Sequence, residues 1–310
     1  MRRPLLRGFT LLELLCAMAL GVLIVGAALD LFAGGARALA AGEESSQLSE
    51  QARAALASME LDLQQAGFLG LTRQGADFRL LQQGDESTAL PATALRQGST
   101  PVAAFGTAVQ ACGDNFALDL SLPVQAADDH YALGPHLKPA CAARGGGAVA
   151  GTDTLTIRRA AAVTTSPAAG RVQLLIDRLD ATRRFVFADG MLPAGSSLQP
   201  DLLEVHDLVL VAYYVAHDSD GHPGLPALRV KTLTSVSGTP AFTDTEIMTG
   251  IQDLQVQLLV AGGWVTPEAL PTDATVRAVR LTLTARAQDA PGSEPRLLTW
   301  TRTVGIRNAL

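Results

Sequence analysis

The chain has 310 residues, of which 48% are hydrophobic and 17% are charged, and its formal net charge at pH 7 is −6. A charged fraction below the ~25% of an average globular protein, combined with ordinary apolar content, excludes an intrinsically disordered chain. The acidic balance argues against a nucleic-acid partner, because neutralising phosphate groups requires clustered basic residues, and the chain has just two lysines, Lys138 and Lys231.

The N-terminal segment combines a short basic start with a long apolar run. Three arginines fall within residues 1–8, and residues 14–29 carry no charge. With its apolar flanks the run covers 9–33, which as a helix would measure about 37 Å and could cross a hydrocarbon core of about 30 Å. The arginines ahead of it predict an N-terminus in the cytoplasm and the rest of the chain across the membrane. The sequence therefore predicts a leader followed by a transmembrane half-helix.

A cleavable secretory signal peptide is the alternative interpretation of this segment, and Glu13 argues against it. The apolar region of a signal peptide should follow its basic residues without a charge, whereas Glu13 falls inside that region. A carboxylate in a membrane segment costs several kcal/mol unless it is paired or lies close to the interface. Glu13 is therefore a candidate functional residue.

The residues around Glu13 resemble the class III N-terminal motif of type IV pilins and pseudopilins. Residues 8–13 read GFTLLE, after a short basic leader that ends in glycine. The resemblance implies cleavage between Gly8 and Phe9 by a prepilin peptidase and N-methylation of Phe9. It also implies an assembly contact in which Glu13 pairs with the terminal amine of a neighbouring subunit. Such a pair between adjacent helices would make both charges tolerable in lipid.

A helical pattern continues beyond the membrane segment. Apolar or small residues recur every three or four positions, at Leu48, Ala52, Leu56, Met59, Leu63 and Ala66. This stripe is typical of a helix that packs on a core, and it predicts an amphipathic half-helix at 34–67 that ends at Gly67. Glycines weaken the middle of the long helix, where we expect a kink or a melted stretch: Gly34, Gly35 and Gly42.

From residue 68 to 310 the pattern changes to strands separated by turns rich in glycine, proline and aspartate. The predicted strands lie at 116–122, 154–157, 172–176, 184–187, 208–215, 228–233, 254–260, 276–285 and 297–306. A long helix followed by mostly antiparallel strands predicts an α+β fold, in which the helix packs on a β-rich globular domain.

The order of several short blocks narrows the resemblance to PilW-type minor pilins. These blocks are the helix end at 52–70 and the segments 153–158, 207–215, 250–257, 276–283 and 303–308. The resemblance implies a minor pilin that helps to initiate or cap a type IV pilus at its tip. Its implied partners are the prepilin peptidase, other minor pilins, the major pilin and a tip adhesin. It implies a single-pass inner-membrane protein with a periplasmic C-terminal domain before assembly, and a pilus-tip location afterwards.

Cys112 and Cys141 both follow the membrane segment, in a compartment that permits disulfides. We expect a bridge between them, with two free buried thiols as the alternative. Cys16, in the membrane segment, is interpreted as a small apolar residue. Many PilW-type relatives have a cysteine just after the helix, where this chain has Leu71 and Thr72, so no disulfide is expected there.

The chain contains no G-x-S-x-G, H-E-x-x-H or S-x-x-K sequence, which are motifs of catalytic and metal sites. Residues 217–222 (HDSDGH) are interpreted as a long hairpin turn, because Arg229 stands where a calcium loop needs glutamate. The glycines at 145–147 are interpreted as a mobile loop. We therefore expect a structural protein that is not an enzyme and has no cofactor or metal. The alternatives are a J-type minor pseudopilin of a type II secretion system and a membrane-anchored periplasmic enzyme or binding protein.

Overall fold

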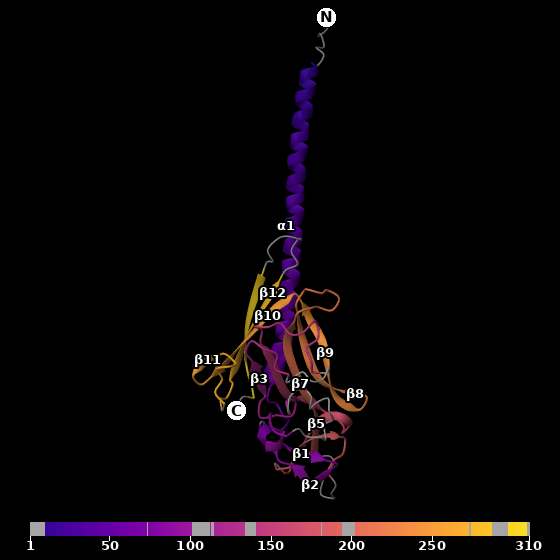
Figure 1. Cartoon of the computed structure of the whole chain (residues 1–310), viewed down its shortest axis with the longest axis vertical. Coiled ribbons are helices and arrows are strands. Elements are labelled where there is room, and N and C mark those ends of the chain that lie inside the picture. The colour runs from indigo at the N-terminus through magenta and orange to yellow at the C-terminus, as the bar shows by residue number, and fades with distance from the viewer. Residues whose placement is uncertain are drawn as a thin grey trace. The chain divides into compact units, whose positions relative to one another are not determined.

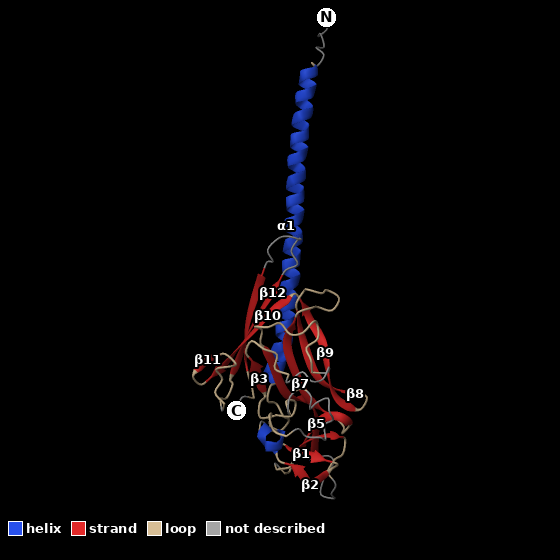
Figure 2. Ribbon diagram, in the orientation of Figure 1, coloured by secondary structure: helices blue, strands red, loops and turns tan. Residues whose placement is uncertain are grey.

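In the computed structural model, one long helix precedes two β-sheets (Figures 1 and 2). The chain divides into two compact units, Met1–Glu50 and Gln51–Leu310. The predicted cleavage site, Gly8 and Phe9, lies outside the described residues. The structure describes residues 10–72, 74–100, 112, 115–133, 141–180, 182–193, 202–272, 274–286 and 297–308.

Helix α1 spans Leu11–Gln65, and its residues up to Glu50 belong to the first unit. The helix passes through its three central glycines without interruption, so the expected melted stretch is absent. Each glycine keeps its N–H group, and the hydrogen-bond ladder therefore continues at a cost of only about 1 kcal/mol per glycine. Gly67, with φ +72°, follows the end of the helix as predicted, and its N–H donates to the Arg158 carbonyl at 3.1 Å.

The larger sheet has nine strands in the order β2-β1-β6-β5-β7-β4-β3, with β8 added to β7 and β9 added to β8. All pairs are antiparallel except β1 with β6. The strands are β1 (Arg79–Gln82), β2 (Asp85–Leu90), β3 (Val124–Ala127), β4 (Thr154–Thr164), β5 (Ala169–Asp177), β6 (Arg184–Asp189), β7 (Leu203–Ala216), β8 (Ala227–Val236) and β9 (Thr239–Thr249). Two short 3-10 helices, Gly75–Asp77 and Ala92–Leu95, flank β1 and β2.

The smaller sheet has four antiparallel strands in the order β11-β10-β12-β13. The chain enters it directly from β9 through Gly250, which has φ +81°. Asp153 joins the two sheets, because its N–H donates to the carbonyl of Leu254 at 2.9 Å and its carboxylate accepts the N–H of Val256 at 2.6 Å. The strands are β10 (Ile251–Val260), β11 (Gly263–Val265), β12 (Ala278–Arg286) and β13 (Leu297–Gly305).

Within the second unit, the end of α1 packs on the sheets through the predicted stripe. Five of the six stripe residues belong to this unit and are buried: Ala52, Leu56, Met59, Leu63 and Ala66. The sixth, Leu48, belongs to the first unit and is half-buried. Polar contacts add to this packing. Asp62 accepts hydrogen bonds from Arg159 of β4 at 2.9 Å and from the Tyr213 hydroxyl of β7 at 2.7 Å. The α+β fold, with a long helix on mainly antiparallel strands, is therefore confirmed.

One predicted strand is wrong. Residues 116–122 form compact turns, and the strand of this region is β3. Asn115 starts the turns, because its carbonyl accepts the N–H groups of Leu118 and Asp119 at 2.8 and 3.2 Å. The alternating sequence FALDLSL resembles that of a strand with one buried face. In the structure, however, all five side chains at 116–120 are buried, so burial does not alternate along this segment. The turns are held from β4 by Arg158, whose guanidinium donates to the carbonyls of Phe116 and Leu122.

Candidate functional site

The start of α1 is organised by a reciprocal contact between Thr10 and Glu13. The Thr10 N–H and hydroxyl both donate to Glu13 Oε2 at 3.0 Å, and the Glu13 N–H donates to Thr10 Oγ1 at 3.3 Å. This is a capping box, in which the N-cap residue and the third helical residue each satisfy a backbone donor of the other. The T-x-x-E spacing is a recognised sequence signal for a capping box, and the interpretation of Glu13 as an assembly residue did not include this role.

The capping box fixes the position of the candidate assembly carboxylate. Glu13 lies in the first turn of α1, and one of its two hydrogen-bond donors is the backbone N–H of the residue that follows Phe9. Cleavage after Gly8 would leave an amine on Phe9, one residue before the cap. The carboxylate and the new amine would then both belong to the end of the same helix, where the helix dipole favours the carboxylate.

The first part of α1 offers a continuous apolar surface. Every side chain from Leu11 to Phe32 is exposed within the described chain. This helix is long and apolar enough to cross a membrane, with a mean hydropathy of 2.4 over its most apolar 18 residues. Exposed apolar surface on this scale is typical of a segment that lipid or neighbouring helices cover. Cys16, a free cysteine, is exposed on this helix.

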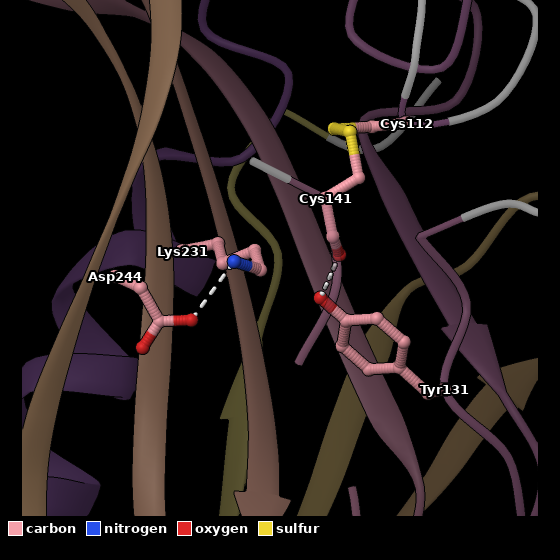
Figure 3. The surroundings of a disulfide bond; sticks show 5 residues. All are labelled: Cys112, Tyr131, Cys141, Lys231 and Asp244. Carbon is pink, nitrogen blue, oxygen red and sulfur yellow. Dashed lines mark hydrogen bonds and ion pairs between the residues drawn. A yellow bond between two sulfur atoms is a disulfide. The ribbon is translucent and has the colours of Figure 1, made fainter. Parts of the chain in front are cut away.

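In the globular unit, Cys112 and Cys141 form a disulfide with both residues fully buried (Figure 3). The bridge joins residues that are 29 positions apart. Tyr131 lies beside it and donates its hydroxyl hydrogen to the carbonyl of Cys141 at 2.7 Å. The ring of Tyr131 packs edge-on against Tyr214 of β7, with their centroids 5.0 Å apart. Tyr131 thus links the bridge to β7 of the larger sheet.

Breaking this bridge should cost stability. Closing a loop of this length contributes about 3.5 kcal/mol in the chain-entropy model. Cys112→Ser should therefore lower the free energy of unfolding by a few kcal/mol and reduce the amount of protein in the membrane fraction. Denaturant unfolding of the full chain in detergent, without reductant, would measure the difference. Cys16→Ser is the matched control, because Cys16 is free. Equal midpoints for Cys112→Ser and the control would contradict the prediction.

A buried charged cluster lies on the same face of the sheet. Lys231 Nζ and Asp244 Oδ2 are 2.9 Å apart, on neighbouring residues of β8 and β9 (Figure 3). Arg229 Nε lies 2.7 Å from Asp244 Oδ1. The Tyr214 hydroxyl donates to Asp244 Oδ2 at 2.6 Å. Burial alone would raise the pKa of Asp244, but the hydrogen bonds from these three partners outweigh it and lower the pKa below its ordinary value. We interpret the cluster as structural.

The two loops singled out in the sequence lie against each other. Residues 217–222 lie in the turn between the antiparallel strands β7 and β8, so the predicted hairpin is confirmed. The interpretation of 145–147 as a mobile loop stays a prediction, and in the structure this loop is hydrogen-bonded to the β7–β8 turn. The N–H groups of His217 and Asp218 donate to the carbonyls of Gly147 and Gly145 at 3.0 and 2.8 Å. A Cβ on Gly145 would lie 2.2 Å from the Asp218 carbonyl oxygen, so this close approach requires glycine.

A group of three carboxylates, Asp128, Asp129 and Asp153, has oxygens within 4.8 Å of one another. Asp153 is buried, and both of its oxygens accept backbone N–H groups, from Asp129 at 2.9 Å and from Val256 at 2.6 Å. The carboxylate at the centre of the group is thus engaged in joining the sheets. The expectation that the protein has no metal stays a prediction.

The comparison with known protein families identifies the N-terminal segment. Residues 6–29 match the prokaryotic N-terminal methylation motif. This range contains the candidate cleavage site, the capping box and the start of the apolar helix. The match supports a pilin- or pseudopilin-type substrate of prepilin peptidase, and the helix is consistent with inner-membrane anchoring. No curated protein and no solved structure matches the chain.

Proposed function

We propose that the protein is a minor pilin, a structural subunit without catalytic activity that helps to initiate or cap type IV pilus assembly at the tip. The observation that carries the proposal is the methylation motif at 6–29. It lies at the start of a helix whose first turn holds Glu13 in a capping box, and an uncharged apolar run follows. A globular unit with two sheets follows the helix. A subunit that displays a domain outside the membrane requires such a unit.

The assembly contact follows from the geometry at the helix start. In a single chain, the Glu13 carboxylate accepts hydrogen bonds from Thr10 alone among the described residues. A carboxylate has about four acceptor sites, so oxygen lone pairs remain for a second donor. The methylated amine of Phe9 from a neighbouring subunit would supply that donor together with a positive charge. The resulting pair would form only on assembly, between this chain and another minor pilin or the major pilin. Prepilin peptidase would act earlier, as the partner that cleaves the leader.

The pilus is favoured over a type II secretion system by the PilW-like blocks. Four of them fall on β4, β7, β10 and β12, each of which is paired on both sides within its sheet. A J-type pseudopilin remains the second candidate, because the same N-terminal motif serves both systems. Deletion of the gene should reduce surface pili and twitching while leaving protein secretion intact. The opposite phenotype would place the subunit in the secretion system.

Processing should produce a mature chain that starts at Phe9 and carries an N-methyl group. Only a small residue should fit the peptidase subsite that Gly8 would occupy at the membrane face. Gly8→Trp should therefore leave the precursor uncut, whereas Pro4→Ala, a change elsewhere in the leader, should be processed normally. Intact-mass measurement of membrane-extracted protein distinguishes the two forms. A wild-type chain that still begins at Met1, or that is cut beyond residue 20, would contradict the proposed class.

A further inference from the structure

The smaller sheet ends in an open edge. Strand β13 pairs with β12 over nine consecutive residues without a register shift, and no described strand pairs with its other side. It contains no proline, and natural proteins commonly use proline or a bulge to block such an edge. The strand is thus a regular template for one more strand.

The direction of the backbone groups on this edge follows from one hydrogen bond. Just beyond β13, the Ile306 N–H donates to the carbonyl of Arg277 at 2.9 Å, toward β12. Backbone groups of successive residues in an antiparallel ladder point to alternate sides. The N–H and carbonyl groups of the odd-numbered residues Thr299, Thr301 and Thr303 therefore point toward the open edge.

A groove lies directly beside this edge, between β13 and the end of α1, with a volume of about 530 Å³. Its lining residues are Arg53, Leu56, Ala57 and Glu60 of α1 and residues 299–302 of β13. A strand added to β13 would lie about 4.8 Å away, and every second side chain would point to the inner side of the sheet. Those side chains would enter the groove, so the open edge and the groove form one binding surface.

The charge of the groove favours an acidic occupant. Arg302 Nη2 lies 2.7 Å from Glu60 Oε2, so this pair is neutral overall. Arg53 is exposed and makes no ion pair within the described chain. The groove thus has one positive charge in excess. A carboxylate on the inward face of an added strand would meet that charge.

We propose that the open edge of β13 and its groove bind an extended segment of a different pilin-class subunit, which adds a strand to the smaller sheet and places an acidic side chain against Arg53. The proposal rests on the proposed function, because α1 contributes one wall of the groove and is also the helix through which subunits would associate. Backbone pairing then supplies affinity, and the groove supplies specificity.

Photo-cross-linking in the native host tests this interface. A p-benzoylphenylalanine at Thr303 of the full chain should cross-link to another protein that carries the N-terminal methylation motif. The same probe at Thr243, an exposed threonine on the free edge of β9, should not. Mass spectrometry of the product identifies the partner and the joined peptides.

Matched variants separate backbone pairing from groove filling. Thr301→Pro removes an outward N–H and should reduce the cross-linked product about tenfold, while Thr301→Val, which keeps the N–H, should not. Ala57→Arg, on the exposed face of α1, should fill the groove and reduce the product, while Ala57→Ser should not. This second pair keeps the test decisive even if Thr301→Pro impairs folding.

Three outcomes would overturn the inference. They are unchanged product in both Thr301→Pro and Ala57→Arg, product between two copies of this chain, and equal product from Thr243. The N-terminus of the mature chain is determined in the same cells. A chain cleaved after Gly8 without the expected cross-link refutes the docking surface alone, whereas an uncleaved chain refutes the proposed function.

Discussion

Replacing Glu13 with leucine should leave a mature, folded protein in the inner membrane while pilus number and twitching fall sharply. The leader is unchanged, so cleavage after Gly8 should survive, and removing a charge should favour membrane insertion slightly. Incorporation should fail, because the Phe9 amine of the neighbouring subunit would lose its partner. Removing one member of a buried ion pair typically costs about 3–5 kcal/mol.

Conservative variants at the same position separate charge from packing. Glu13→Gln keeps the side-chain length and can still accept the Thr10 hydrogen bonds, so it should preserve the cap but fail in assembly. Glu13→Ala should fail as well, and Glu13→Asp should be partly tolerated. Complementation of a deletion strain with these four variants, with mature protein checked by immunoblot, measures the effect. Wild-type piliation with Glu13→Leu would remove the main physical support for the proposed assembly role.

Thr10→Val is the matched control for the capping box. This substitution removes the hydroxyl that donates to the Glu13 carboxylate and accepts the Glu13 N–H, but it leaves the Glu13 charge in place. The loss of a cap costs about 1 kcal/mol of helix stability, much less than the loss of a buried pair. Piliation should therefore fall far less with Thr10→Val than with Glu13→Leu.

The second large effect is expected at Asp244. Asp244→Ala should destabilise the globular unit by about 3–5 kcal/mol, because it leaves two buried cations, Arg229 and Lys231, without their shared carboxylate. Lys231→Met should cost less, since Asp244 would keep Arg229 and Tyr214. Denaturant unfolding in detergent, at neutral pH, compares the variants. Equal losses for the two substitutions would contradict this account.

The pH dependence of stability provides a second test of Asp244. Its folded-state pKa lies below the usual 3.8, so the carboxylate contributes stability that is fully present above that value. This contribution is lost as the pH falls through the lowered folded-state pKa. The difference in unfolding free energy between wild type and Asp244→Ala should therefore be constant near neutrality and should shrink below about pH 4. A difference that grows on acidification would contradict the assignment.

The elements that the sequence predicts well share a simple burial pattern. The stripe on α1 and strands such as β7 and β12 show the apolar spacing expected for a helix or a strand. This spacing arises because one or both faces of each element are buried in the globular unit. Strand β9 was missed because its inward positions include Asp244 and Glu246, whose charges are neutralised by partners on other elements. A polar residue paired across strands cannot be distinguished from a loop residue in a single sequence.

The candidate functional features also include some that the sequence predicts and some that it does not. The N-terminal motif is local, so contiguous residues sufficed to find it, and the capping box was equally readable from its spacing. The order of the strands, the contact of 145–147 with the β7–β8 turn and the groove beside β13 depend on pairings between distant residues. Periodicity does not specify such pairings, because several strands of similar pattern could take each place.

Asp62 is one of the points at which a mechanical load on the last turns of α1 would enter the globular unit. Asp62 binds Arg159 of β4 and Tyr213 of β7, and these strands lie inside the larger sheet. Strand β4 is paired on both sides, and β7 is paired with three neighbours. A strand at a sheet edge can detach by breaking one ladder, whereas pulling either of these two out requires at least two ladders to rupture. Tension that passes through Asp62 would therefore meet strands that are held by ladders on both sides.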